Sequence, residues 1–246
     1  MVKLTEKILG ESFTKDYLIR VAFEIRFPAD LTMKDKIGYF QGKIKENFPI
    51  YEERYAVKLP IQDVEKGNLL NYSFKNDITE TEIYLNTYSI FGLGTKKYNG
   101  FKNFLNIFLE NVEIFKEMFK IESTTRLGMR YINSIPLEKD KNNSNTLKNK
   151  YFDFCLTEDQ NYDFENQYID LRFNENKYEI HKQLVFQKGQ QNFYEVIIDL
   201  DNSYKEKILI KEDLKELESR ILDLHKLIKI KFFEIIKEEF LELLKK

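Results

Sequence analysis

Apolar residues recur along this chain at two different spacings, and these spacings predict where strands and helices lie. Alternation at residues 17–27 predicts a strand that buries Val21, Phe23, Ile25 and Phe27. A helix is predicted at 32–47, with Thr32 as its N-cap. Strands are then predicted at 51–59, 68–75 and 80–91, the last one extended through a bulge at 92–95. An amphipathic helix at 100–120 completes the order β-α-β-β-β-α.

The rest of the chain repeats that order. Strands are predicted at 124–135, which Pro136 would end, and at 162–173, 178–187 and 193–200. A short helix is predicted at 146–154 and one continuous helix at 211–244. We therefore predict an α+β fold built from two β-α-β-β-β-α half-repeats, residues 1–121 and 122–246, in one compact pseudo-duplicated unit. Long helices would hold one face of its curved antiparallel sheets, as in saddle and helix-grip folds.

The two opening strands carry arginines on their polar faces. Arg126 and Arg130 flank Gly128, opposite the apolar face of their strand. Glycine leaves the surface bare, so a ligand or another backbone could approach there. Such an arginine pair could bind phosphate or carboxylate, and the candidate anion-binding residues are Arg126, Arg130, Arg20, Arg26 and Asn133. The alternative is cross-strand ion pairing on a solvated face, with Glu24, Asp170, Glu179 or Glu195 as the partner.

Two aspartates at the end of strand 193–200 are candidate metal ligands. Asp199 and Asp201 would point to the same face and could bind a divalent cation. The alternative is that Asp201-Asn202-Ser203 forms a turn. His225, His181 and Cys155 are interpreted as structural residues, because none belongs to a recognisable catalytic motif.

Composition narrows the class of protein. The chain is 42% hydrophobic and 33% charged, which is typical of globular proteins, and its net charge of −2 argues against a surface made for polyanions. A single cysteine excludes an internal disulfide. No leader-like or membrane-spanning segment is recognised, so we expect a cytoplasmic protein. The P-loop, dinucleotide-binding and zinc-protease motifs are missing, and no cofactor is predicted.

Several stretches of the sequence resemble those of a known family. They are Phe23–Pro28, Phe48-Pro49, Phe101–Phe104, Arg126–Asn133, Asp199–Asp201, Leu224-His225 and Phe232–Glu234. Together they resemble a sporadically distributed family of uncharacterised prokaryotic proteins of similar length. Its most recognisable stretch is an Arg-Leu-Gly-Leu-Arg-Tyr-Ile-Asn strand, in which Met129 stands here for the usual second leucine. The resemblance implies no activity, but the patchy distribution implies a mobile-element or anti-phage defence setting.

Two classes of function follow from these observations. The first is a non-enzymatic binding protein that contacts a partner protein, a second copy or an anionic ligand. Its contacts would be made by the polar sheet face or by the helix at 211–244, which would span roughly 50 Å at about 1.5 Å per residue. The alternative is a nucleic-acid or nucleotide-binding protein, such as a metal-dependent phosphodiesterase or nuclease. Its metal would lie on Asp199 and Asp201, and its phosphate on Arg126 and Arg130. The missing catalytic motifs and the scarcity of histidine favour the first class.

Overall fold

The computed structural model describes residues 17–30, 32–56, 69–86, 90–138, 151–153, 166–188 and 193–244. Its first elements are β1 (Leu18–Arg26), α2 (Met33–Ile44), β2 (Ile50–Ala56), β3 (Leu69–Asn76), β4 (Thr81–Asn86), β5 (Ile90–Thr95) and α3 (Phe101–Phe119). The later ones are β6 (Ser123–Thr124), β7 (Arg126–Glu138), β8 (Asn166–Glu175), β9 (Tyr178–Lys188), β10 (Phe193–Tyr204), β11 (Ile208–Leu209), α5 (Lys215–Phe233) and α6 (Glu238–Leu244).

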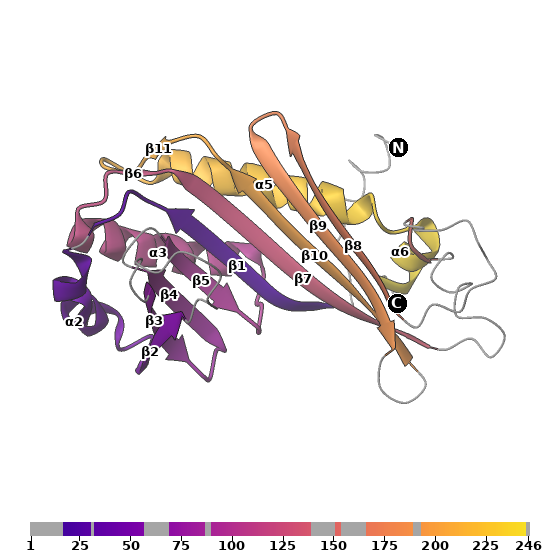
Figure 1. Ribbon diagram of the computed structural model, residues 1–246, viewed down its shortest axis with the longest axis horizontal. Coiled ribbons are helices and arrows are strands. Elements are labelled where there is room, and N and C mark those ends of the chain that lie inside the picture. Colours follow the sequence, from indigo (N-terminus) through magenta and orange to yellow (C-terminus); the bar gives the residue numbers. More distant parts are fainter. Residues whose placement is uncertain are drawn as a thin grey trace, which may run out of the picture. The chain divides into compact units, whose positions relative to one another are not determined.

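Within the described residues, nine of these strands form one large sheet, in the order β2-β3-β4-β5-β1-β7-β10-β9-β8 (Figure 1). The predicted α+β class with a large antiparallel sheet is therefore confirmed. The chain packs as two compact units. Unit 1 comprises Met1–Ile19, Arg130–Asn202 and Leu222–Lys246, and unit 2 comprises Arg20–Met129 and Ser203–Ile221. These units divide the chain at other points than the boundary between residues 121 and 122 that the predicted half-repeats would give.

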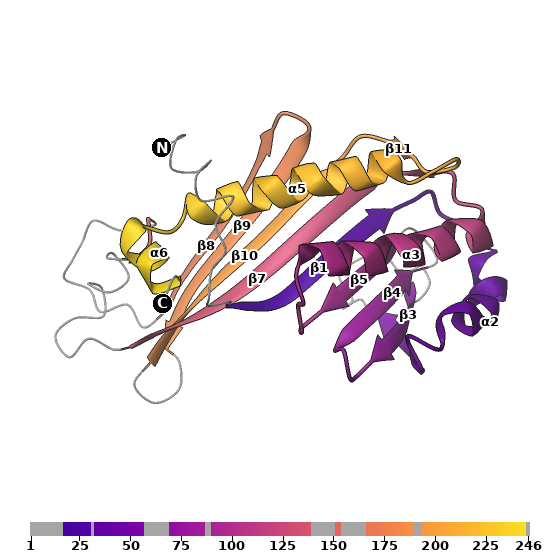
Figure 2. The same cartoon turned by 180° about the vertical axis from the view of Figure 1, so that it is seen from behind.

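A phenylalanine-rich core joins the helices of unit 2 to one face of its strands. Helix α3 lies across this face, behind the strands in Figure 1 and in front of them in Figure 2. Phe23 of β1 packs edge-on against Phe104 and Phe108 of α3, with ring centroids 4.8 and 5.4 Å apart. Phe40 of α2 packs against Phe91 of β5 and against α3. Val21, Phe23 and Ile25 of β1 are fully buried in this core. The residues between them therefore point to the opposite, polar face of the sheet.

The predicted strand 80–91 is wrong in extent, because the structure contains two antiparallel strands at that place. Thr81 lies opposite Thr95, and Tyr84 lies opposite Gly92. Ile83 and Leu85 of β4 and Phe91 and Leu93 of β5 are all buried, and all have odd numbers. One apolar spacing of two residues therefore continues from the first strand into the second. The described part of residues 1–121 consequently contains one strand more than predicted.

Two other strand ends were predicted too early. Strand β7 continues through Pro136, which is exposed, because Ile135 and Leu137 on either side are still buried. Strand β10 runs to Tyr204, so Asp201-Asn202-Ser203 is part of the strand rather than a turn. In both strands the buried alternation extends further than the turn-forming residues suggest.

The continuous helix predicted at 211–244 is also wrong. Helix α5 ends at Phe233, and α6 begins only at Glu238. Between them the backbone pairs with residues 151–153. The Asp153 N–H donates to the Ile235 carbonyl (2.6 Å), and the Lys237 N–H donates to the Tyr151 carbonyl (2.8 Å). These bonds satisfy groups that would otherwise continue the helix, and α5 alone is 19 residues long.

Most of the short helix predicted at 146–154 lies outside the described residues. Cys155 lies outside them as well. None of the helices described in the structure combines the length and the apolar character that a membrane crossing requires.

Helix α3 ends on a residue in the left-handed conformation. Lys120 has φ 58° and ψ 40°, and the N–H of Ile121 donates to the Lys116 carbonyl at 3.2 Å. This is the arrangement in which glycine is preferred at helix ends, because a Cβ is unfavourable there. We predict that Lys120→Gly stabilises the fold by about 1 kcal/mol in urea denaturation.

The control is Glu110→Gly, in the middle of the same helix on its exposed side. It should destabilise the protein by about 1 kcal/mol, since glycine is a poor residue inside a helix. If both variants changed the unfolding free energy in the same direction, the explanation based on backbone conformation would be wrong.

Candidate functional site

Arg126 and Arg26 lie on either side of one carboxylate in unit 2. The Nη1 of Arg126 donates to Glu24 Oε1 at 2.9 Å, and the Nε of Arg26 donates to the same oxygen at 3.1 Å. The Arg126 and Glu24 side chains are 17% and 21% exposed, so their pair is partly shielded from water. Two of the predicted anion-binding arginines therefore contact an internal anion.

Gly128 accommodates the side chain of Arg126. A Cβ built on Gly128 would lie 2.6 Å from Arg126 Nη1, which is too close for any atom at that position. The space that was expected to admit a ligand or another backbone is thus occupied by the guanidinium two residues earlier. The glycine allows Arg126 to lie flat on its own strand and reach Glu24.

Arg130 and Asp199 form a two-point ion pair in unit 1. The Arg130 Nε donates to Asp199 Oδ1 at 2.8 Å, and Nη2 donates to Oδ2. Asp199 is only 8% exposed, and both of its carboxylate oxygens accept hydrogen bonds from this arginine. Asp201 lies two residues further along β10 and is half-buried. No group of three or more His, Cys, Asp or Glu side chains that could hold a metal ion occurs among the described residues.

Asn133 and His225 belong to the packed side of unit 1. Asn133 lies on the same face of β7 as the buried Tyr131 and Ile135 and is only 7% exposed. Arg130 therefore points to the opposite face. His225 Nδ1 lies 3.0 Å from the Tyr131 hydroxyl. Burial, together with the charge of Lys229, lowers the pKa of His225 to about 4. At neutral pH this histidine is an uncharged hydrogen-bonding partner.

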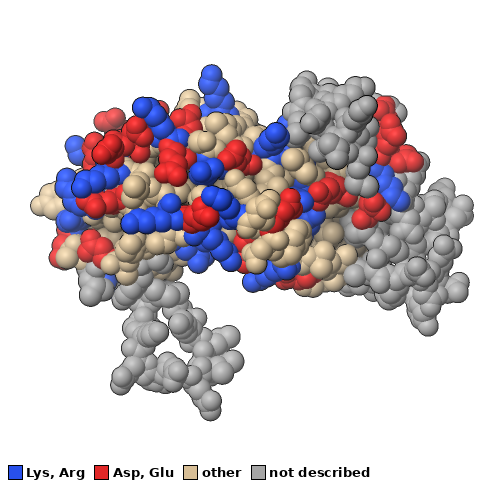
Figure 3. All heavy atoms as spheres, turned by 90° about the horizontal axis from the view of Figure 1, so that it is seen from above, with Lys and Arg blue, Asp and Glu red and all other residues tan. Residues whose placement is uncertain are grey.

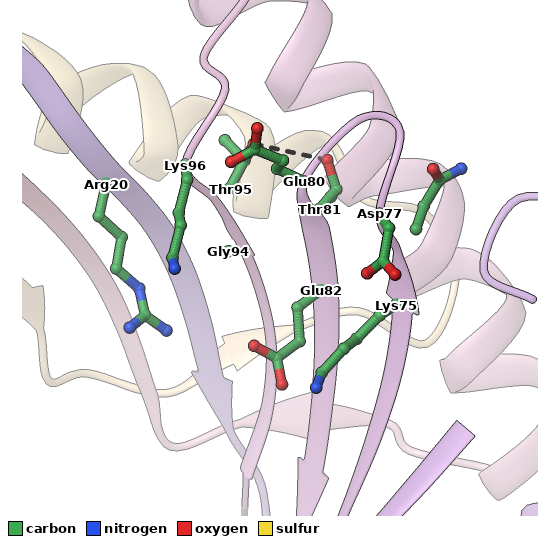
Figure 4. Close-up of a pocket in the computed structure, with 10 residues that line it drawn as sticks. Arg20, Lys75, Asp77, Glu80, Thr81, Glu82, Gly94, Thr95 and Lys96 are labelled. Carbon is green, nitrogen blue, oxygen red and sulfur yellow. Dashed lines mark hydrogen bonds between the residues drawn. The ribbon is translucent and has the colours of Figure 1, made fainter. Parts of the chain in front are cut away.

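Arg20 lines a pocket in unit 2, on the polar side of β3, β4 and β5 (Figure 4). The pocket volume is about 510 Å³. Figure 4 shows Arg20 and Lys96 on one side of Gly94, and Glu82 and Lys75 on the other. Arg20 Nη2 would lie 3.8 Å from a Cβ at position 94, so the guanidinium lies beside the glycine without blocking it. The pocket is lined by Arg20, Lys75, Asn76, Asp77, Glu80, Thr81, Glu82, Gly94, Thr95 and Lys96.

The charged groups of this pocket differ in their partners. Lys75 Nζ lies 2.6 Å from Glu52, and Glu82 accepts a hydrogen bond from the Ser73 hydroxyl. Within the residues that the structure describes, the side chains of Arg20 and Lys96 have no carboxylate partner. The exposed side chains of Arg20 and Lys96 thus lie beside Gly94, in a hollow that could bind an anion.

Of the predicted anion-binding residues, only Arg20 lines this pocket. Lys96 and Gly94 were missed, because Gly92 and Gly94 were interpreted as a bulge. Two glycines at a spacing of two in a strand remove neighbouring side chains from the same face, and this signal could have indicated a hollow. The ring of Tyr84 covers Gly92, since a Cβ there would lie 2.1 Å from it, whereas Gly94 stays open.

Elsewhere the charges are mixed. On the face shown in Figure 3, acidic and basic side chains alternate, and no broad area of one sign is visible. This agrees with the near-neutral net charge of −2.

We predict that the effect of Gly128→Ala depends on Arg126. In the wild-type background the new Cβ would displace Arg126 from Glu24, and loss of this pair should cost about 1 kcal/mol. In an Arg126→Ala background the same change should stabilise the strand by about 0.5 to 1 kcal/mol, because alanine is favoured over glycine there. Urea denaturation of the four variants measures the coupling. Equal effects in both backgrounds would show that the glycine serves something other than Arg126.

His225 should make the folded protein sensitive to mild acid. Unfolded histidine takes up a proton below about pH 6.5, but folded His225 does so only near 4. The unfolded state therefore binds more protons in that window, and stability should fall as the pH falls from 6.5 to 4, by up to about 3 kcal/mol. His225→Gln should remove this part of the pH dependence, and His181→Gln, which keeps His225, should retain it. Urea denaturation at several pH values measures both, and a wild-type slope in His225→Gln would contradict the assignment.

Comparisons of the sequence with protein-family models and with curated proteins find no match. The resemblance to the sporadically distributed family therefore stands on the motif residues alone. The site itself consists of arginines paired with internal carboxylates and of a pocket lined by Arg20 and Lys96, which have no carboxylate partner in the described part of the chain.

Proposed function

We propose that this chain is a non-enzymatic binding protein that takes a small anionic ligand in the pocket between Arg20 and Lys96. The observation that carries the proposal is the contrast among the cations. Arg126 and Arg130 each contact an internal carboxylate, whereas Arg20 and Lys96 border a hollow of about 510 Å³ and have no carboxylate partner in the described residues.

The groups in the pocket suit an anion that also carries hydrogen-bond donors. A guanidinium presents a planar fork to phosphate or carboxylate oxygens, and a lysine adds a point charge beside it. The acidic residues Asp77, Glu80 and Glu82 lie at the same pocket and could accept from hydroxyl or amino groups. They would also repel an extended polyanion. These features favour a small phosphate or carboxylate compound that bears hydroxyl or amino groups.

The nucleic-acid alternative ranks second. A nuclease of the predicted kind would bind metal through Asp199 and Asp201, but Asp199 has both oxygens on Arg130. A nucleic-acid surface is commonly a broad basic area, and the face in Figure 3 is of mixed sign. The family resemblance supports placing the binding role in a mobile-element or defence system, where the ligand would act as a signal rather than a substrate.

The strand order supports the proposed internal duplication. From the opening strand of each half outward, the sheet runs β1-β5-β4-β3-β2 and β7-β10-β9-β8. In both halves the last strand lies beside the first, and the others follow in reverse. We propose that the two halves descend from one unit, in which β5 corresponds to β10 and the outermost strand β2 is the extra strand of the first half.

The test is a titration followed by amide NMR, with inorganic phosphate and a nucleoside monophosphate as probes. We expect chemical-shift changes at Gly94 and its neighbours, with Arg20→Gln and Lys96→Gln each weakening binding about tenfold or more. The reason is that a hydrogen bond to a charged group contributes about 1.5 to 3 kcal/mol. Lys97→Gln is the matched control, because this neighbouring exposed lysine does not line the pocket.

A second variant blocks the pocket without removing charge. Gly94→Val would place a side chain on the floor, where a Cβ meets only ordinary van der Waals contacts, and valine is favoured in strands. The protein should fold and lose the ligand. Binding of either probe that survives in both Gly94→Val and Arg20→Gln would refute the pocket as the site.

A further inference from the structure

Strand β8 lies at the end of the sheet order, next to β9 alone among the described strands. It pairs with β9 over its whole length, from Asn166 opposite Gln187 to Glu175 opposite Tyr178. Alternate backbone N–H and C=O groups on its other side therefore face away from the described sheet. A long edge of this kind is a template for another strand.

The composition of β8 leaves this edge open to a strand of matching charge. Proteins usually block an edge strand with proline, a bulge or charged side chains, above all lysine. Residues 166–175 contain no proline and no lysine, and the charges at the middle of the strand, Asp170 and Arg172, are of opposite sign. Several large side chains are exposed instead: Tyr168 is 57%, Leu171 is 49% and Phe173 is 39% exposed. Ile169, Leu171 and Phe173 share one face, and Tyr168, Asp170 and Arg172 share the other.

We propose that two copies of this chain pair through β8 as antiparallel strands, with the two-fold axis at Leu171. Residues whose numbers add to 342 then lie opposite each other. Asp170 of each copy faces Arg172 of the other on the polar face, and Ile169 faces Phe173 on the apolar face. Leu171 meets its own counterpart at the axis. An interface with two-fold symmetry needs such a self-complementary patch.

Charge selects this register over its neighbours. An axis at Asp170 would set the two Asp170 carboxylates opposite each other, and an axis at Arg172 would oppose the two guanidiniums. A slip by one residue would place Leu171 on the polar side, because the side-chain period of a strand is two. Among these registers, only the axis at Leu171 joins opposite charges and keeps both faces continuous.

The charged pair is already arranged for this contact. His181 Nε2 lies 2.8 Å from Asp170 Oδ1, and Gln183 and Tyr168 donate to Oδ2 of the same carboxylate. These contacts hold the Asp170 side chain in place on the polar face. The Arg172 side chain is 66% exposed, and its Nε is 3.7 Å from Asp170 Oδ1, so the guanidinium can reach a second carboxylate.

Disulfide cross-linking tests the register. In a Cys155→Ser background, Leu171→Cys would place two cysteines opposite each other at the axis, about 4.5 to 5.5 Å apart at Cα, within the range that a disulfide spans. We expect a covalent dimer after mild oxidation. Phe173→Cys alone should not cross-link, because its counterpart is Ile169, but the double variant Ile169→Cys/Phe173→Cys should.

Sedimentation equilibrium tests the assembly without cross-linking. The wild type should be a dimer, and Arg172→Asp and Asp170→Arg should each be monomeric, since each opposes like charges. Mixing these two variants should restore a dimer, because both cross-strand pairs become attractive again. Lys226→Asp, an exposed change on α5, should remain dimeric. A monomeric wild type would overturn the proposal, and so would dimers of Arg172→Asp alone. Neither readout depends on the Arg20 pocket.

Discussion

Burial of one aromatic sheet face is the constraint on which the rest of this structure depends. Phe23 packs against α3 and is fully buried. Because a strand has a period of two, this packing directs Arg20, Ala22, Glu24 and Arg26 to the other side. A slip of one residue would bury two arginines at considerable cost, so the polar face is specified as firmly as the core. The ion pairs and the pocket follow from it.

The sequence predicted most strands and the core, because a strand that is buried on one face alternates apolar and polar residues. The prediction failed where strand pairing or backbone hydrogen bonds determine where an element ends. One apolar period ran through both β4 and β5 and concealed that these are two strands. The stripe on the last helix continued across the break at 234–237, where the backbone pairs with residues 151–153. A pattern of side chains cannot record such a backbone interaction.

The functional residues were harder to predict for a related reason. Which arginine is neutralised depends on strand order and register, and these join residues far apart in sequence. Arg126 and Glu24 are 102 positions apart, and Arg130 and Asp199 are 69 apart. The sequence identified the arginines and named Glu24 among their candidate partners, but it could not decide which arginine pairs with which carboxylate. Arg20 was predicted only as an addition to the Arg126 and Arg130 pair, yet in the structure it borders a hollow.

Gly128 has a consequence for how the Arg126–Asn133 stretch can change over time. Since the guanidinium of Arg126 occupies the space above it, a larger residue at 128 disturbs the Arg126–Glu24 pair as long as the arginine is present. Replacement of the arginine removes this cost, so replacement of the glycine is easier after it than before it. A contact within the protein thus couples positions 126 and 128, and this contact favours one order of substitution over the other.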